Sequence, residues 1–141
     1  FLESLHMETA SLYLALSGVL TVLLWTPYIL ARMVVWGLPT FLSNYPDGYP
    51  ATQPEPPLWA QRAHRAHLNM VETMPAFIAV VLAAGALVDS AGAAAVGQWA
   101  QVFFLARVGH AIVYLLGIPY LRTPVYLISW AAVLMIGLQI L

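Results

Sequence analysis

Four long apolar stretches dominate this chain and leave few ways for it to fold. They cover residues of about 9–36, 59–88, 98–116 and 124–141, and a helix needs about 20 apolar residues to cross a bilayer. Only 8% of the residues are charged and 62% are hydrophobic, whereas a soluble domain carries about a quarter charged residues. Mean hydropathy is +0.82. We therefore predict an all-α, integral membrane four-helix bundle that forms a single domain over residues 1–141.

Charge and cysteine content exclude several function classes. The net charge of −1 gives no electrostatic basis for nucleic-acid binding. The chain has no cysteine, so it has neither disulfides, nor a thiolate metal site, nor a thiol nucleophile of its own. All five cationic residues are arginine, whose planar fork suits the recognition of carboxylates in buried sites. Any sulfur chemistry must therefore use a thiol from outside.

Two connections separate the first three apolar stretches. Residues 37–58 hold six of the ten prolines, which predicts an extended or turn-rich loop. Within it, Tyr45 and Tyr49 fit either a lid over a site or an ordered cap at the level of the lipid headgroups. Residues 88–97, which include Asp89, predict a short turn of small residues.

A polar stripe runs along the second apolar stretch. Arg62, Arg65, Asn69 and Glu72 fall within roughly 80° of one another on a helix. A carboxylate at the bilayer centre costs about 2.5–3.5 kcal/mol, so Glu72 should face protein and find a cation. The stripe fits either one buried ion pair that joins two helices or a polar pocket that includes such a pair.

A second stripe lies on the third apolar stretch. Arg107, His110 and Tyr114 follow Phe103 at helical spacing and share one face. Because an arginine deep in a span must also be neutralised, we expect Arg107 to pair with Glu72. Two facing stripes that open toward the same end predict a ligand pocket between the helices.

The fourth stretch has a weaker polar edge. Arg122, Tyr126, Ser129 and Trp130 lie near its start. This edge fits a wall of the pocket and equally an aromatic belt at the membrane interface.

The residues for a metal site or a hydrolase triad are missing. His64 and His67 are three residues apart, yet there are few carboxylates and no cysteine to complete a ligand set. Asp89 should lie at the opposite membrane face from His110. We therefore predict no metal site and no Ser-His-Asp hydrolase.

Arginines also predict the orientation in the membrane. Arg32, Arg62, Arg65 and Arg122 cluster at the end that holds the first and third connections. The positive-inside rule places that end in the cytoplasm, with both termini outside.

Three motifs resemble one known family. R-A-H-L-N-M-V-E (residues 65–72), followed by Pro75, is similar to the second-helix signature of the MAPEG family, the membrane-associated proteins of eicosanoid and glutathione metabolism. R-V-G-H-A-I-V-Y (residues 107–114) resembles its third-helix signature, and L-R-T-P (residues 121–124) its entry to the fourth helix. The match covers nearly the whole chain in order and spacing, including Arg32. The chain looks like a bacterial-type member of the family.

The resemblance implies a four-helix protomer, usually a homotrimer, that holds glutathione between neighbouring subunits near the cytoplasmic face. The positions that match glutathione-contacting or supporting residues are Arg32, Arg65, Asn69, Glu72, Arg107, His110 and Tyr114. Catalytic members carry an arginine and a tyrosine early in the fourth helix, where this chain has Tyr126 and Trp130, and an arginine where it has Leu68. Arg122 and Tyr126 are therefore the candidate catalytic residues.

Two functions follow from the resemblance. One is a membrane-embedded glutathione-dependent transferase or peroxidase that acts on lipophilic electrophiles, in a bacterial inner membrane. The other is a non-catalytic membrane protein that binds a lipid or assists a partner protein, because the family includes such members. The absence of the fourth-helix arginine favours the second, and fold alone does not decide between them.

Overall fold

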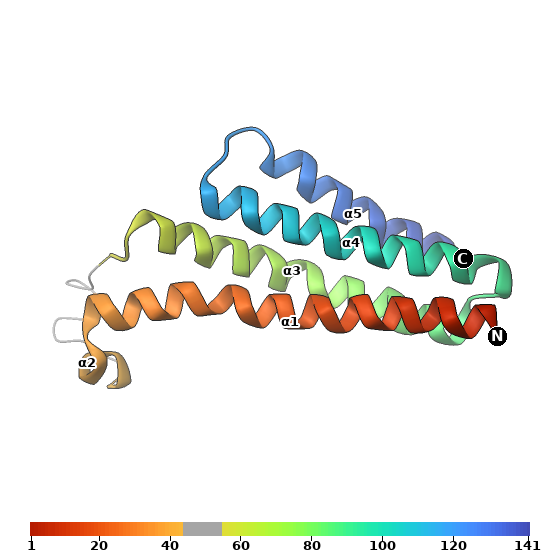
Figure 1. Cartoon of the computed structure of the whole chain (residues 1–141), viewed down its shortest axis with the longest axis horizontal. Helices are drawn as coiled ribbons and strands as arrows, with labels where there is room; N and C mark the ends of the chain where they lie inside the picture. The colour runs from red at the N-terminus through yellow and green to blue at the C-terminus, as the bar shows by residue number, and fades with distance from the viewer. Residues whose placement is uncertain (44–54) are drawn as a thin grey trace.

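The computed structural model describes residues 1–43 and 55–141 of the chain, and within them all the regular secondary structure is helical. There are four long helices and one short one: α1 (Leu2–Trp36), α2 (Leu38–Leu42), α3 (Leu58–Leu87), α4 (Ser90–Leu116) and α5 (Arg122–Leu138). Consecutive long helices run in opposite directions (Figure 1). The two termini and the α3–α4 turn therefore lie at one end of the bundle, and the α4–α5 turn lies at the other. This confirms the all-α, four-helix prediction.

Helices α3 and α4 each pack against all the other long helices, and the contacts of α4 with α1 and α5 are the most extensive in the bundle. Close approach is possible where the facing residues are small. Ala60, Ala63 and Ala66 of α3 are fully buried, and so is Ala100 of α4. The Phe77 and Phe103 rings stack between α3 and α4, with their centroids 3.8 Å apart.

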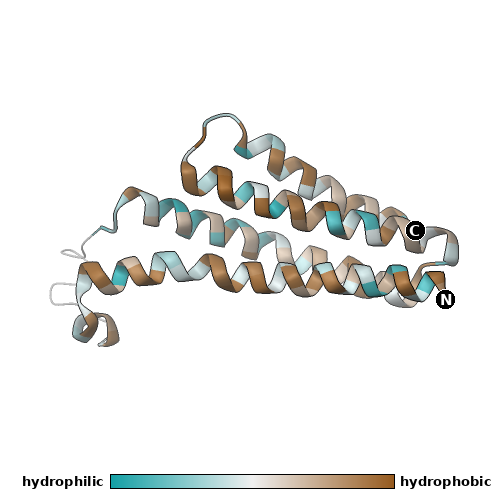
Figure 2. Ribbon diagram, in the orientation of Figure 1, coloured by the Kyte–Doolittle hydropathy of each residue, from teal (hydrophilic) through white to brown (hydrophobic). Residues whose placement is uncertain are grey.

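The outer surface of the bundle is apolar. Large side chains such as Val34 and Leu82 are 84% and 64% exposed. Hydrophobic residues cover much of the four long helices, whereas hydrophilic ones gather in the first half of α3 (Figure 2). Contiguous apolar surface on this scale suits lipid rather than water. The chain is an integral membrane protein.

The predicted helix starts were too late at two places. Helix α1 begins at Leu2 rather than near residue 9, and α4 begins at Ser90 rather than near residue 98. The predicted turn at 88–97 is therefore wrong for most of its length. Asp89 caps α4, since its Oδ1 accepts a hydrogen bond from the Gly92 amide at 2.8 Å. The small residues that suggested a turn instead bring α4 close to α1: a Cβ at Gly97 would lie 3.0 Å from the His6 carbonyl.

Three of the four long helices, α1, α3 and α4, are long and apolar enough to cross a membrane. Helix α5 is apolar but has 17 residues, which at 1.5 Å per residue is about 25 Å, less than the ~30 Å hydrocarbon core. It begins two residues before Pro124. A crossing by α5 therefore stays a prediction.

The predicted proline-rich loop contains one short helix. Helix α2, with Pro39 in its first turn, occupies Leu38–Leu42, where the sequence had predicted no regular helix. Proline is tolerated there because the first amides of a helix have no intrahelical partner. The interpretation of Tyr45 and Tyr49 as a lid or cap lies outside the described residues.

Candidate functional site

A cavity of about 400 Å³ lies between α3, α4 and α5. We call it the core-side cavity. Its lining residues are Arg65, Asn69, His110, Tyr114, Arg122, Thr123 and Tyr126. Six of these seven are among the nine predicted site residues. Thr123 was missed, although it adjoins Arg122 within the L-R-T-P motif.

Helical spacing explains why these side chains meet. Residues three or four apart lie on the same face of a helix. Arg65 and Asn69 are four apart on α3, as are His110 and Tyr114 on α4, and Arg122 and Tyr126 on α5. Each helix thus supplies one such pair, α5 adds Thr123, and the packing of α4 against α3 and α5 brings the three pairs together.

Arg107 lies behind these residues and ties the three helices together. It is 1% exposed. Its Nη2 donates to Asn69 Oδ1 on α3 at 2.6 Å, and its Nη1 donates to Ser129 Oγ on α5 at 3.4 Å. Its Nε donates to Met70 Sδ at 3.2 Å. The Ser129 hydroxyl in turn donates to the Tyr126 carbonyl at 2.6 Å.

The predicted ion pair between Glu72 and Arg107 is wrong. Glu72 is exposed on α3, and the hydrogen bonds of Arg107 go to neutral groups. The reason is the rotation of α3, which turns Asn69 and Met70 toward α4. Glu72 lies about 60° from Asn69 on the side away from Met70, so it lies beyond the edge of the face that contacts Arg107.

Aromatic rings surround the buried imidazole of His110, which is 2% exposed. The Tyr114 ring meets it edge-on at 5.5 Å between centroids, and the Tyr126 ring lies at 6.2 Å. The Arg122 guanidinium lies 5.0 Å above the Tyr114 ring, and the Arg107 guanidinium 5.7 Å from the Tyr126 ring. Such cation–π contacts orient both arginines without neutralising them.

Arg32 lies apart from the core-side cavity. Its guanidinium is 4.0 Å above the Trp36 ring and 5.5 Å from the Tyr28 ring, both on α1. Its buried Nε has no hydrogen-bond partner. Within one chain the structure therefore does not bring Arg32 or Glu72 together with the other predicted site residues.

The two histidines of α3 make ordinary interhelical contacts with α1. The His64 ring stacks on Tyr28 at 3.9 Å, and His67 Nδ1 lies 3.0 Å from the Thr21 carbonyl. Across residues 1–43 and 55–141, no three His, Cys, Asp or Glu side chains group as metal ligands would.

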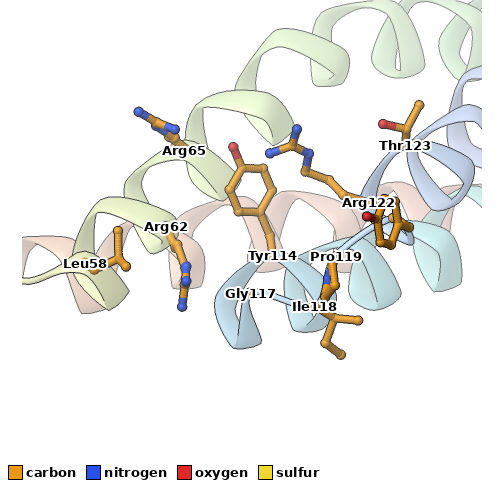
Figure 3. Close-up of a pocket in the computed structure, with 10 residues that line it drawn as sticks. Leu58, Arg62, Arg65, Tyr114, Gly117, Ile118, Pro119, Arg122 and Thr123 are labelled. Carbon is orange, nitrogen blue, oxygen red and sulfur yellow. The ribbon is translucent and has the colours of Figure 1, made fainter.

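A second cavity of about 450 Å³ opens at the end of the bundle that holds the α4–α5 turn (Figure 3). We call it the end cavity. It shares Arg65, Tyr114, Arg122 and Thr123 with the core-side cavity. Arg62 lines only the end cavity.

Comparison with known proteins identifies the family of the chain. The sequence profile of the MAPEG family matches residues 7–141, which include all four long helices but for the first turns of α1. No curated protein and no solved structure gives a significant match. The chain is a member of the MAPEG family.

Proposed function

We propose that the protein is a glutathione-dependent transferase or peroxidase that acts on lipophilic electrophiles, with glutathione held in the core-side cavity. The observation that carries this proposal is the convergence of six family-signature residues on one cavity of about 400 Å³. That volume lies in the usual range of small-molecule sites, about 300–1,000 Å³.

The charge of the cavity suits the carboxylates of glutathione. Arg65 and Arg122 line it, and none of its lining residues in the described chain is acidic. Arg107 adds a third positive charge behind Asn69, and its hydrogen-bond partners are neutral. Guanidinium forks bind carboxylates through paired, charge-assisted hydrogen bonds, which are strong where water is excluded.

The chemistry requires that the thiol of glutathione lose its proton, because the thiolate is the nucleophile. A free thiol has a pKa of about 8.5, so a positive charge or a hydroxyl donor must favour the thiolate. Arg122 and Tyr126 are the candidates for this role. In conjugation the thiolate forms a C–S bond with the electrophile, whose leaving group departs. In the peroxidase reaction two glutathiones become one disulfide while a hydroperoxide becomes an alcohol and water.

The rival function is a non-catalytic membrane protein that binds a lipid or assists a partner protein. Trp130, at the position where catalytic members carry a tyrosine, is 53% exposed and does not line the core-side cavity. Conjugation activity separates the two functions.

The conjugation rate of the detergent-purified protein with glutathione and a dinitrophenyl halide is the decisive measurement. We expect Tyr126→Phe to lower the rate about 10- to 100-fold, because a donor that stabilises the reacting charge is lost. Tyr13→Phe is the matched control, since Tyr13 packs against Phe104 away from the cavity. A wild-type rate no higher than that of glutathione in buffer would overturn the transferase proposal and favour the rival.

We further propose that the protein is a homotrimer in which neighbouring subunits complete the site. Glu72 is exposed on an apolar helix, and a carboxylate that faces lipid costs about 2.5–3.5 kcal/mol. A neighbouring subunit would remove that cost. Glu72 and Arg32 would then contact the glutathione of an adjacent copy, where Glu72 would hold its amine and Arg32 one of its carboxylates.

The orientation we propose places the arginine-rich end in the cytoplasm of a bacterium and both termini on the outer side of its inner membrane. A reporter enzyme that is active only outside the cytoplasm, fused after Leu141, should therefore be active. Activity of a cytoplasm-only reporter at the same position would contradict this orientation and would place the cavities on the wrong side.

A further inference from the structure

The end cavity is a cationic chamber at one end of the bundle. Three arginines line it, Arg62 and Arg65 from α3 and Arg122 from α5, and no acidic residue does so in the described chain. Tyr114 lies between Arg62 and Arg122 in Figure 3. Guanidinium groups that share a cavity repel one another unless an anion lies between them. The cavity therefore favours an anionic ligand.

Arg62 packs against the end of α4. Gly117 ends that helix in the left-handed conformation, with φ at 68°. A Cβ on Gly117 would lie 2.5 Å from Cζ of Arg62, so the guanidinium packs directly on the glycine backbone. Because glycine has no side chain, Arg62 can occupy this position. A side chain fixed before binding loses less entropy when a ligand arrives.

The end cavity also has apolar and aromatic neighbours that suit the membrane interface. Tyr120 and Leu58, which line it, are 93% and 61% exposed, and the adjacent Trp59 is 51% exposed. Aromatic residues are enriched at the level of the lipid headgroups. Helix α3 has 30 residues, about 45 Å, so its first turns project beyond a ~30 Å hydrocarbon core. Arg62 lies in these turns.

From this arrangement we propose that the end cavity binds the phosphate group of an anionic phospholipid. The arginines of the cavity attract the phosphate, Arg62 contacts its oxygens, and the acyl chains lie along the exposed apolar surface beside Leu58. A phosphate offers several oxygens to several forks at once, which suits three arginines better than one carboxylate does. This site overlaps the glutathione site at Arg65 and Arg122 but extends beyond it, since Arg62 and Tyr120 line the end cavity and not the core-side cavity.

The test compares lipids added to the purified full-length protein in a neutral detergent. Phosphatidylglycerol should raise the thermal unfolding midpoint more than phosphatidylcholine does, because only the former is anionic. Arg62→Gln should need about five- to tenfold more phosphatidylglycerol for the same shift. Arg62→Lys keeps the charge, so it should need less phosphatidylglycerol than Arg62→Gln for the same shift. Thr40→Asp on α2 lowers the charge of the same end of the bundle by one unit outside the cavity (Figure 1) and should behave as the wild type.

A second pair of variants tests the site without touching the packing of Arg62. Tyr120 has a φ of 68°, a conformation that Asp and Asn tolerate better than most residues. Its side chain is almost fully exposed, so both Tyr120→Asp and Tyr120→Asn should fold. The Asp variant places a negative charge at the cavity and should bind phosphatidylglycerol several-fold more weakly than the Asn variant, which has the same shape.

Two results would overturn the proposal. If Arg62→Gln and Thr40→Asp weaken the response to phosphatidylglycerol alike, the lipid senses only the total charge of this end. If glycerol 3-phosphate stabilises the protein as well as phosphatidylglycerol does at equal concentration, the ligand is a soluble phosphate and not a lipid. Stabilisation by glutathione should persist in Tyr120→Asp, so the lipid site and the glutathione site can fail independently.

Discussion

Asn69→Leu is expected to lower the free energy of unfolding by about 2–3 kcal/mol, because it removes the shortest hydrogen bond of a buried charge. Asn69 Oδ1 accepts from Arg107 at 2.6 Å, and Arg107 is 1% exposed. Arg107→Met should lower the free energy of unfolding by less, since it removes the buried charge itself and replaces it with a flexible apolar side chain. The double variant Asn69→Leu/Arg107→Met should therefore be more stable than Asn69→Leu alone.

Thermal or denaturant unfolding of the four proteins in one detergent measures this coupling as a double-mutant cycle. Glu72→Leu provides the contrast. Glu72 is exposed and makes no bond to Arg107. Adding Glu72→Leu to Arg107→Leu should therefore not restore any of the stability that Arg107→Leu loses. Rescue by Glu72→Leu, or a double variant no better than Asn69→Leu, would show that the neutral network around Arg107 is not what holds these helices together.

Glutathione at about 100 times its dissociation constant is expected to stabilise the wild-type protein by about 2.7 kcal/mol. Arg65→Ala should abolish this increment and leave the unliganded protein folded, because Arg65 is exposed in the cavity mouth and its removal buries no unpaired group. Tyr126→Phe should keep most of the increment, since we propose that its hydroxyl acts on the thiolate rather than on binding. Thermal unfolding with and without millimolar glutathione measures both effects.

The same measurement tests the proposed assembly. Arg32 and Glu72 lie away from the core-side cavity of their own chain. Loss of the glutathione increment in Arg32→Ala or Glu72→Gln would therefore mean that a neighbouring subunit supplies these groups. An unchanged increment in both variants would confine the site to one chain. No shift at all in the wild type would overturn the glutathione site itself.

Periodicity predicted the composition of each helix face well but not the contacts between helices. Spacings of three and four residues placed Arg65 with Asn69, and His110 with Tyr114, and the structure brings these pairs to one cavity. The same stripe was expected to carry Glu72 toward Arg107. A stripe about 80° wide has two edges, and only the packing of α3 on α4 decides which edge is buried. That packing depends on side-chain shapes from both helices, which a single helical pattern does not contain.

The helix ends and the position of Arg32 could not be predicted from the sequence, for a similar reason. The small residues of 88–97 suggested a short turn, yet the Asp89 cap and the close contact of Gly97 with α1 allow a helix there. Arg32 was placed in the site by family resemblance. Its guanidinium instead stacks on Trp36, a contact within α1 that a motif shared with other proteins does not reveal.

The shortness of α5 has a consequence for the surrounding lipid. Its 17 residues span about 25 Å, so if this helix spans the membrane, a bilayer with a ~30 Å core must thin by about 5 Å beside it to avoid hydrophobic mismatch. Thinning lowers the headgroup layer toward Arg122, the first residue of α5. A lipophilic molecule that diffuses in the bilayer would then reach the arginines where the hydrocarbon core is thinnest. It would pass between the acyl chains and the protein without crossing water.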